Sequence, residues 1–356
     1  MKRISTILLV LLAGAAAMAQ QQPQPQQSPQ FGEKIDVNVV LLDAVVTDSR
    51  GRQILGLGPD DFTVTENGVP QQIQSVDYFT NRKMVDTPEN KAAVKVERTR
   101  EERYFILFFD KPQEAVLLNR LVHARGAAID FVNNQLKPND RVAVAGHDVR
   151  LKVYSDFTND KKQLARALDD ATAFGRGVLD PPAGPSPSIL RSVNRHRMMS
   201  HTGSTYEALE VLADALRPIK ARKDLVLFSA GILTPDQTVQ KGVAINRSRF
   251  YDRAVYALNT ADVSLYPANI VDVPNLSPVF HQALEGLAID TNGEYFRFNN
   301  TFTGALRRVE QMTNGYYLIS YTTQKPRGNP GFQKVKVTVR NPDFKVRARE
   351  GYSYGS

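Results

Sequence analysis

The chain of 356 residues lacks cysteine and tryptophan altogether. Without cysteine it has no disulfide framework, thiolate metal site, cysteine nucleophile or lipidated N-terminal cysteine. No apolar run after residue 19 approaches the roughly 20 residues that cross a bilayer, so we expect no transmembrane span. The Gly-x-Ser-x-Gly elbow, the Walker loop and the His-Glu-x-x-His motif are also missing, which disfavours several large enzyme classes. The remaining composition, 42% apolar and 23% charged, is that of a globular protein.

The first 19 residues have the pattern of a secretory signal peptide. Lys2 and Arg3 precede an apolar run over residues 4–13, and small residues end the segment at Ala19. This order of charged, apolar and small residues predicts cleavage near Ala19 and a periplasmic or secreted mature protein. A spacer rich in glutamine and proline follows over residues 20–33, and its composition cannot form a packed core.

The mature chain changes its hydrophobic pattern three times. Residues 34–80 alternate apolar and polar positions and predict an N-terminal β-module, and residues 81–103 read as a polar linker. Strand and helix patterns then alternate over residues 104–314, which predicts an α/β domain with a doubly wound, mostly parallel sheet. Residues 315–356 return to a β pattern. We therefore expect the α/β domain to be inserted into a small antiparallel β-sandwich formed by the N- and C-terminal segments.

Three segments resemble those of one known family. They are Asp-Phe-Thr-Val-Thr-Glu-Asn-Gly at residues 61–68, Asp-Phe-Thr-Asn-Asp at residues 156–160, and the closing β-segment that begins at residue 316. With them the chain resembles the von Willebrand factor A-type domain family, specifically the acidobacterial A-domain-related secreted proteins, over about residues 37–352. The resemblance implies the fold described above and a ligand site at the C-terminal edge of the parallel sheet, where such domains commonly bind a divalent ion.

The metal ligands that the resemblance implies are incomplete in this chain. The family's Asp-x-Ser-x-Ser loop keeps Asp110, but Pro112 and Glu114 stand where it has serine. The family's Ser-Asp-Gly loop has Ala230 in place of the aspartate, and Lys111 adds a positive charge that opposes a cation. We therefore expect a degenerate site that holds no metal or cofactor. Binding of Mg²⁺ or Mn²⁺ through Asp110, Glu114 and one threonine stays open as an alternative.

The family's second loop supplies a threonine, and two residues of this chain fit that position. Thr202 and Thr205 both lie ahead of the helical pattern that follows, and the sequence does not decide between them. Nearby, residues 174–201 form a long proline-rich insertion that carries four arginines against one aspartate. The insertion fits either a partner contact beside the degenerate site or a mobile surface loop.

The positive charge is concentrated near the C-terminus. The full chain has a formal charge of +8, the mature chain +6, and residues 325–350 alone +6. In this segment basic side chains alternate with apolar ones, and if residues 341–343 form a hairpin both basic rows share one outer face. This face is either a site for an anionic envelope polymer or a solvated surface partly neutralised by Asp36, Asp43 or Glu66. The basic residues of the two rows are Lys334, Lys336, Arg340, Lys345, Arg347 and Arg349.

These observations favour an exported, non-enzymatic protein of the adhesion or scaffold type. A protein partner would contact the edge formed by Asp110, Thr205 and the insertion. The alternative is an envelope-associated module that binds anionic polymer through the basic C-terminal hairpin. A weaker alternative is a hydrolase or transferase that uses Asp110. Nucleic acid is disfavoured as a partner, because the chain carries an export signal and its basic face lacks interleaved aromatic residues.

Overall fold

The computed structural model describes residues 37–49, 51–80, 96–97, 102–202, 204–219, 221–232, 238–240, 243–245, 249–271, 278–297, 302–324, 331–349 and 351–354. From Asn38 onward they belong to one compact unit. The predicted signal peptide, the spacer and most of the predicted linker lie outside the described residues. No helix within the described ranges is long and apolar enough to span a bilayer.

A five-stranded sheet forms the centre of the α/β part, with the strand order β12-β9-β6-β7-β8. Strands β12, β9, β6 and β7 are parallel, and β8 runs antiparallel to β7 at the edge. Every residue of β6 and β9 is buried, as the continuous apolar runs in the sequence require of strands covered on both faces. The strands are β6 (Tyr104–Asp110), β7 (Arg141–His147), β8 (Leu151–Thr158), β9 (Lys223–Ser229) and β12 (Val263–Asn269).

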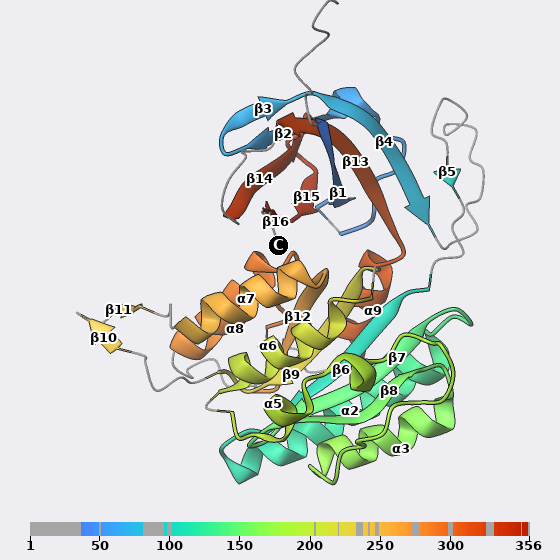
Figure 1. Cartoon of the computed structure of the whole chain (residues 1–356), viewed down its shortest axis with the longest axis vertical. Coiled ribbons are helices and arrows are strands. Elements are labelled where there is room, and N and C mark those ends of the chain that lie inside the picture. The colour runs from blue at the N-terminus through green and yellow to red at the C-terminus, as the bar shows by residue number, and fades with distance from the viewer. Residues whose placement is uncertain are drawn as a thin grey trace, which may run out of the picture. The chain divides into compact units, whose positions relative to one another are not determined.

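Helices cover both faces of this sheet (Figure 1). The face that carries Phe105 and Phe109 of β6 packs against α2, α3 and α9. The opposite face, with Ile106 and Phe108, packs against α4, α5, α6, α7 and α8. The helices are α2 (Leu118–Asn134), α3 (Lys161–Thr172), α4 (Ile189–Ser192), α5 (Arg195–Met199), α6 (Thr205–Leu216), α7 (Arg249–Thr260), α8 (Pro278–Asp290) and α9 (Phe302–Met312).

Two further sheets combine strands from both ends of the chain. Their orders are β15-β1-β13-β4-β5 and β16-β14-β2-β3, and one apolar core joins side chains of both. The predicted α/β domain inserted in a β-sandwich is therefore confirmed. The strands are β1 (Val37–Thr47), β2 (Phe62–Glu66), β3 (Val69–Gln71), β4 (Ile73–Thr80), β5 (Val96–Glu97), β13 (Gly315–Gln324), β14 (Gly331–Val339), β15 (Lys345–Ala348) and β16 (Gly351–Tyr354). A separate pair, β10 (Thr238–Gln240) and β11 (Val243–Ile245), and two 3₁₀ turns, η1 (Pro59–Asp61) and η3 (Ala115–Leu117), complete the described elements.

The predicted hairpin of the C-terminal segment is wrong. Strand β14 pairs with β2 and β16, whereas β15 pairs with β1 in the other sheet. The turn after β14, closed by the Phe344 amide on the Asn341 carbonyl (3.2 Å), carries the chain between the two sheets. Between α8 and α9, the described residues form one isolated bridge, between Phe296 and Ala268.

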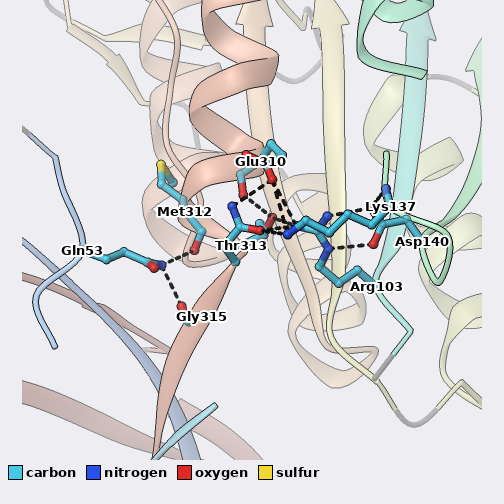
Figure 2. Close-up of polar contacts among 9 residues, drawn as sticks. Gln53, Arg103, Lys137, Asp140, Glu310, Met312, Thr313 and Gly315 are labelled. Carbon is cyan, nitrogen blue, oxygen red and sulfur yellow. Dashed lines mark hydrogen bonds and ion pairs between the residues drawn. The ribbon is translucent and has the colours of Figure 1, made fainter. Parts of the chain in front are cut away.

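Buried polar residues join α9 and β13 to the start of the central sheet (Figure 2). Arg103 forms a two-pronged pair with Asp140 at 2.8 and 2.6 Å, and its remaining nitrogen reaches Asn314 at 3.1 Å. From the other side, the Gln53 side chain donates to the Gly315 carbonyl at 2.8 Å. Residues from the N-terminal segment, the α/β domain and the C-terminal segment thus meet at one junction.

Candidate functional site

Three polar side chains end three neighbouring strands at one edge of the central sheet. Asp110 is the last residue of β6, His147 the last of β7 and Ser229 the last of β9. The parallel register places Asp110 opposite His147, and it aligns Phe109 with Phe228 just ahead of Ser229. The C-terminal edge of an open α/β sheet is where ligand sites of this architecture lie.

The Asp110 carboxylate is buried and both its oxygens accept hydrogen bonds. Oδ2 accepts from the Ser229 hydroxyl at 2.7 Å, and Oδ1 accepts from the Thr205 hydroxyl at 2.8 Å. The Nδ1 atom of His147 lies 3.2 Å from the same Oδ1. Asp110 is 5% exposed and Ser229 is fully buried. Three of the roughly four acceptor positions of the carboxylate are therefore occupied by the protein itself.

Thr202 and Thr205 take different places in this cluster. Thr205, the first residue of α6, bonds directly to Asp110, whereas the Thr202 hydroxyl lies 2.8 Å from Nε2 of His147. A proton on Nδ1 of His147 satisfies the whole set, because Nδ1 then donates to Asp110 and Nε2 accepts from Thr202. The sequence analysis missed His147, because its place beside Asp110 depends on the register between β6 and β7.

The remaining predicted ligand, Glu114, stands apart from this cluster. It precedes η3, is exposed, and makes no hydrogen bond to Asp110, Thr202 or Thr205. Among the described residues no group of three or more histidine, cysteine, aspartate or glutamate side chains is placed to hold a metal ion. One carboxylate that is already saturated by hydroxyl and imidazole groups is a poor fit to Mg²⁺, which takes carboxylates and waters.

The insertion is anchored to the sheet by one buried aspartate. Both oxygens of Asp156 in β8 accept: Oδ1 from the Ile189 amide at 2.9 Å, Oδ2 from the Ser188 hydroxyl at 2.7 Å and the Leu190 amide at 3.1 Å. Asp156 thereby caps α4, the first helical turn of the insertion. Near the opposite end of the insertion, the Val178 amide donates to the Val153 carbonyl of β8 at 2.7 Å. These contacts hold residues 174–201 along the edge strand.

Most arginines of the insertion are used within the chain. Arg191 donates to the carbonyl oxygens of Pro182, Gly184 and Ser186, and Arg197 pairs with Glu210 and Asp214 at 2.9 Å each. Arg195 bonds the Leu179 carbonyl at 3.2 Å. Arg176 differs, because it is exposed and its guanidinium has no ion pair among the described residues.

A cavity of about 630 Å³ lies between the insertion and β8. Its apolar walls continue onto a surface where Val149 is 53% exposed, Val178 43%, Leu179 36% and Met199 44%. The Thr202 amide bonds the Val149 carbonyl at 3.0 Å, so this surface continues into the Asp110 cluster. We call the cavity and this surface the insertion pocket. The apolar lining residues of the cavity are Leu151, Val153, Phe174, Val178, Leu179, Met198 and Met199.

Lys152, which lines the insertion pocket, forms an ion pair with Asp148. Lys152 donates to Asp148 at 2.6 Å and to the carbonyl oxygens of Phe174 and Gly175 at 3.0 and 3.1 Å. Burial by itself would raise the pKa of the Asp148 carboxyl, but the bonds from Lys152 and the Val149 amide outweigh it and lower that pKa. The Lys152 ammonium group is thus occupied by hydrogen bonds within the protein.

The basic residues of the two predicted rows differ in their exposure and in their ion pairs. Lys334, Lys336 and Arg340 are exposed at alternate positions on and just after β14, and Lys345 is exposed on β15. The guanidinium of Arg347 is half-buried and pairs with Glu294 at 3.2 Å, and that of Arg349 pairs with Asp262. Because β14 and β15 belong to different sheets, the two rows do not form the shared hairpin face that the sequence predicted.

Of the acidic residues expected to neutralise these rows, Asp43 interacts with Arg349, whereas Glu66 is engaged elsewhere. Glu66 is buried and accepts from the hydroxyl groups of Tyr321, Thr323 and Tyr352 at 2.8, 3.1 and 3.1 Å. Asp36 lies outside the described residues. Burial raises the pKa of the Asp43 carboxyl, and Arg349 and Arg222 oppose that shift.

No family profile and no curated protein matches the chain. Solved structures with a related arrangement include an aerotolerance-related membrane protein from Bacteroides fragilis, with 12% identity, 59% of this chain and 98% of that chain covered, and a TM-score of 0.38. The vWF domain of the type V pili tip protein Mfa5 from Porphyromonas gingivalis has 12% identity, 60% and 95% coverage, and a TM-score of 0.41. The PilB minor pilin from Streptococcus sanguinis has 10% identity, 79% and 80% coverage, and a TM-score of 0.40. All three TM-scores are below 0.5.

Proposed function

We propose that this protein is an exported, non-enzymatic binding protein of the adhesion or scaffold type, which contacts a protein partner through the insertion pocket and the adjoining Asp110 edge. The observation that carries the proposal is the apolar surface formed by Val149, Val178, Leu179 and Met199 at the ligand edge of the sheet. Contiguous apolar surface beside polar residues is typical of protein interaction sites.

The Asp110 cluster supports this proposal because it fixes the segments at this edge of the sheet. Its hydrogen bonds tie together the ends of β6, β7 and β9 and the loop before α6, and Lys111, which follows β6, places its Nζ atom 5.5 Å from the ring centre of Phe174 in the insertion pocket. A site on such fixed segments is pre-organised for a partner, so binding loses less conformational entropy. In this role Asp110 contacts neither metal nor substrate.

An enzyme that uses Asp110 is the weakest of the three alternatives. The carboxylate is 5% exposed and both its oxygens are hydrogen-bonded, which leaves no oxygen directed at a substrate. We therefore propose a non-enzymatic role for the protein. Hydrolysis or group transfer that disappears in Asp110→Asn, with the fold retained, would contradict it.

Binding of an anionic envelope polymer is a second candidate, on a narrower surface than the sequence indicated. Lys334, Lys336 and Arg340 are exposed on one face of β14 and its end, and they form the basic row that this candidate requires. Binding by this row would be weakened by salt, because exposed charges are screened beyond about 8–10 Å at physiological ionic strength. We propose the periplasm or the cell exterior as the location for either function.

Site-specific photocrosslinking distinguishes the two surfaces. A photoreactive residue at Leu179 is expected to form a discrete protein adduct in native envelope extracts, whereas the same residue at Lys336 is not. The adduct is identified by mass spectrometry, and the purified partner is then titrated against the wild-type protein and against Leu179→Ser/Met199→Ser. Equal affinity for both proteins, or adducts at residue 336 alone, would reject the insertion pocket as the contact surface.

A further inference from the structure

We infer that the insertion pocket binds an acidic and apolar segment of a protein partner, whose carboxylates are held by Lys111, Arg150 and Arg176 without a metal ion. This inference rests on the proposed function and adds the chemistry of the partner. It follows from the distribution of charge around the pocket, where Lys111, Arg150 and Arg176 stand beside apolar side chains.

The whole pocket is large enough for a few side chains. Its volume of about 630 Å³ lies within the range of about 300–1,000 Å³ usual for binding pockets. Phe174 has a left-handed backbone (φ 53°) at the end of α3, where its amide donates to the Ala171 carbonyl at 3.3 Å and the Gly175 amide donates to the Asp170 carbonyl at 2.9 Å. The chain turns there, and Phe174 is part of the pocket lining. Met198 and Met199 supply adaptable walls for apolar side chains.

Three cationic side chains surround this apolar region, and none of them forms an ion pair with another described residue. Arg150 and Arg176 line the pocket itself. Lys111 is exposed, and its Nζ atom lies 5.5 Å from the centre of the Phe174 ring. A cation beside an aromatic ring and an apolar wall keeps its charge available to an incoming anion.

The acidic groups near the pocket do not neutralise these cations. Asp148 is paired with Lys152 at 2.6 Å, and Asp110 is buried within its own hydrogen bonds. Asp180 is almost fully exposed and lies 4.0 Å from Arg195. The Asp170 carboxylate lies beside Gly175 of the lining, so the three cations face one further acidic group and the rim keeps an excess of positive charge next to the apolar side chains. Aspartate or glutamate beside leucine-like residues is the complementary chemistry in an extended protein segment.

Fluorescence anisotropy with synthetic peptides tests this inference. The probe is a labelled hexapeptide that alternates leucine and aspartate, titrated against the full mature chain in EDTA. Two matched peptides carry asparagine for aspartate or serine for leucine. We expect the acidic-apolar peptide to bind about tenfold more tightly than either matched peptide, and raised salt to weaken it.

Two charge-matched variants locate the binding. Arg150→Gln/Arg176→Gln is expected to weaken the peptide about tenfold, whereas Lys334→Gln/Lys336→Gln, which removes the same charge from β14, leaves it unchanged. Thermal unfolding and circular dichroism establish that each variant is folded. A second probe, a heparin fragment, tests for an anionic polymer in the same pocket.

Each other outcome overturns the inference. Equal binding of the asparagine peptide would show that the cations do not recognise carboxylates. A requirement for Mg²⁺ would show that a metal ion mediates the binding. Sensitivity to the β14 variant, or tighter binding of heparin through Arg150 and Arg176, would assign a different ligand. If no peptide binds while the Leu179 crosslink persists, the acidic partner is wrong and the proposed function stands. If both are absent, the proposed function fails as well.

Discussion

Asp110 shows how a single carboxylate organises an edge of the sheet. Its partners come from three other segments: Ser229 ends β9, Thr205 begins α6 and His147 ends β7. A buried carboxylate is tolerated only where hydrogen bonds replace its hydration, and here hydroxyl and imidazole groups provide them. Within the described residues this cluster therefore has a structural role: it holds the ends of these segments together.

The Asp110 cluster leads us to expect no stabilisation by divalent cations. The melting temperature of the mature chain should be the same in EDTA, in millimolar Mg²⁺ and in millimolar Mn²⁺, because an ion that bound only the native state would raise it. Differential scanning calorimetry checks this. A rise in melting temperature that Asp110→Ala abolishes and Glu114→Gln reduces would instead establish a metal site.

His147 marks the limit of residue-level prediction. The sequence places Asp110 at a strand end from its apolar run alone, because a buried parallel strand needs no information from elsewhere. The role of His147 depends on the register between β6 and β7, which pairs it with Asp110 across 37 residues. The choice between Thr202 and Thr205 is of the same kind. Periodicity does not contain such pairings, so they become visible only in three dimensions.

Asp156 makes three hydrogen bonds from β8 to the insertion. Removal of this side chain by Asp156→Ala leaves the Ser188 hydroxyl and the amides of Ile189 and Leu190 without their acceptor. We expect a loss of about 2–4 kcal/mol in the free energy of unfolding, since hydrogen bonds to a charged group are among the stronger ones.

Urea denaturation measures the loss caused by Asp156→Ala, and limited proteolysis reports on the insertion itself. Cleavage within residues 181–187 should become faster than in the wild type. Asp180→Ala is the control, because Asp180 is almost fully exposed and its change should stay within about 0.5 kcal/mol. Equal protease resistance of Asp156→Ala and the wild type would show that other contacts hold the insertion.

The C-terminal strands show what element-level prediction achieved. Period-2 alternation placed Lys334 and Lys336 on the outer face of β14, and the structure has both exposed. The same pattern did not reveal that the turn after residue 340 moves the chain to the other sheet. It also gave no sign that Arg347 and Arg349 pair with Glu294 and Asp262, which lie far away in the sequence. Strand existence follows from local pattern, whereas sheet membership follows from packing.

The junction at Arg103 contributes to the stability of the whole molecule. Arg103 is 7% exposed and contacts Asp140 and Asn314 from different segments (Figure 2). Arg103→Met leaves the buried Asp140 carboxylate without its partner, which typically costs about 3–5 kcal/mol. We expect one cooperative unfolding transition at lower urea concentration, measured by circular dichroism. The exposed pair gives a control: Arg125→Met, which frees Asp169, should change stability by about 1 kcal/mol or less. Similar losses in both variants would contradict the assigned role of Arg103.

The buried tyrosines predict the response of the molecule to alkali. Burial raises the pKa of the Tyr206, Tyr317 and Tyr321 hydroxyls above their usual value near 10, and it raises the pKa of Tyr352 to about 12. The unfolded chain loses these protons first, so the stability they contribute is complete below about pH 10 and declines as the pH rises above it.

Tyrosinate absorbance and far-ultraviolet circular dichroism, followed together from pH 9 upward, test this response. Because the chain has no tryptophan, its near-ultraviolet spectrum reports on tyrosine. A group of tyrosines should ionise only with the loss of secondary structure, and Tyr321→Phe should reduce the decline. Ionisation of all tyrosines near pH 10 in a folded protein would contradict the burial of these hydroxyl groups.

The sandwich sets an order of assembly for the newly made polypeptide. In its sheet β1 lies between β15 and β13, and Val46 faces Val346 across nearly the whole chain. Contacts this distant in sequence form slowly, because the intervening chain must first be brought together. Strand β1 therefore keeps open hydrogen-bonding edges while the α/β domain emerges, and open edges favour pairing with other chains. A nascent chain halted before Gly315 would leave β1 without either of its neighbours, so this strand stays open to pairing with other chains until the C-terminal strands have been made.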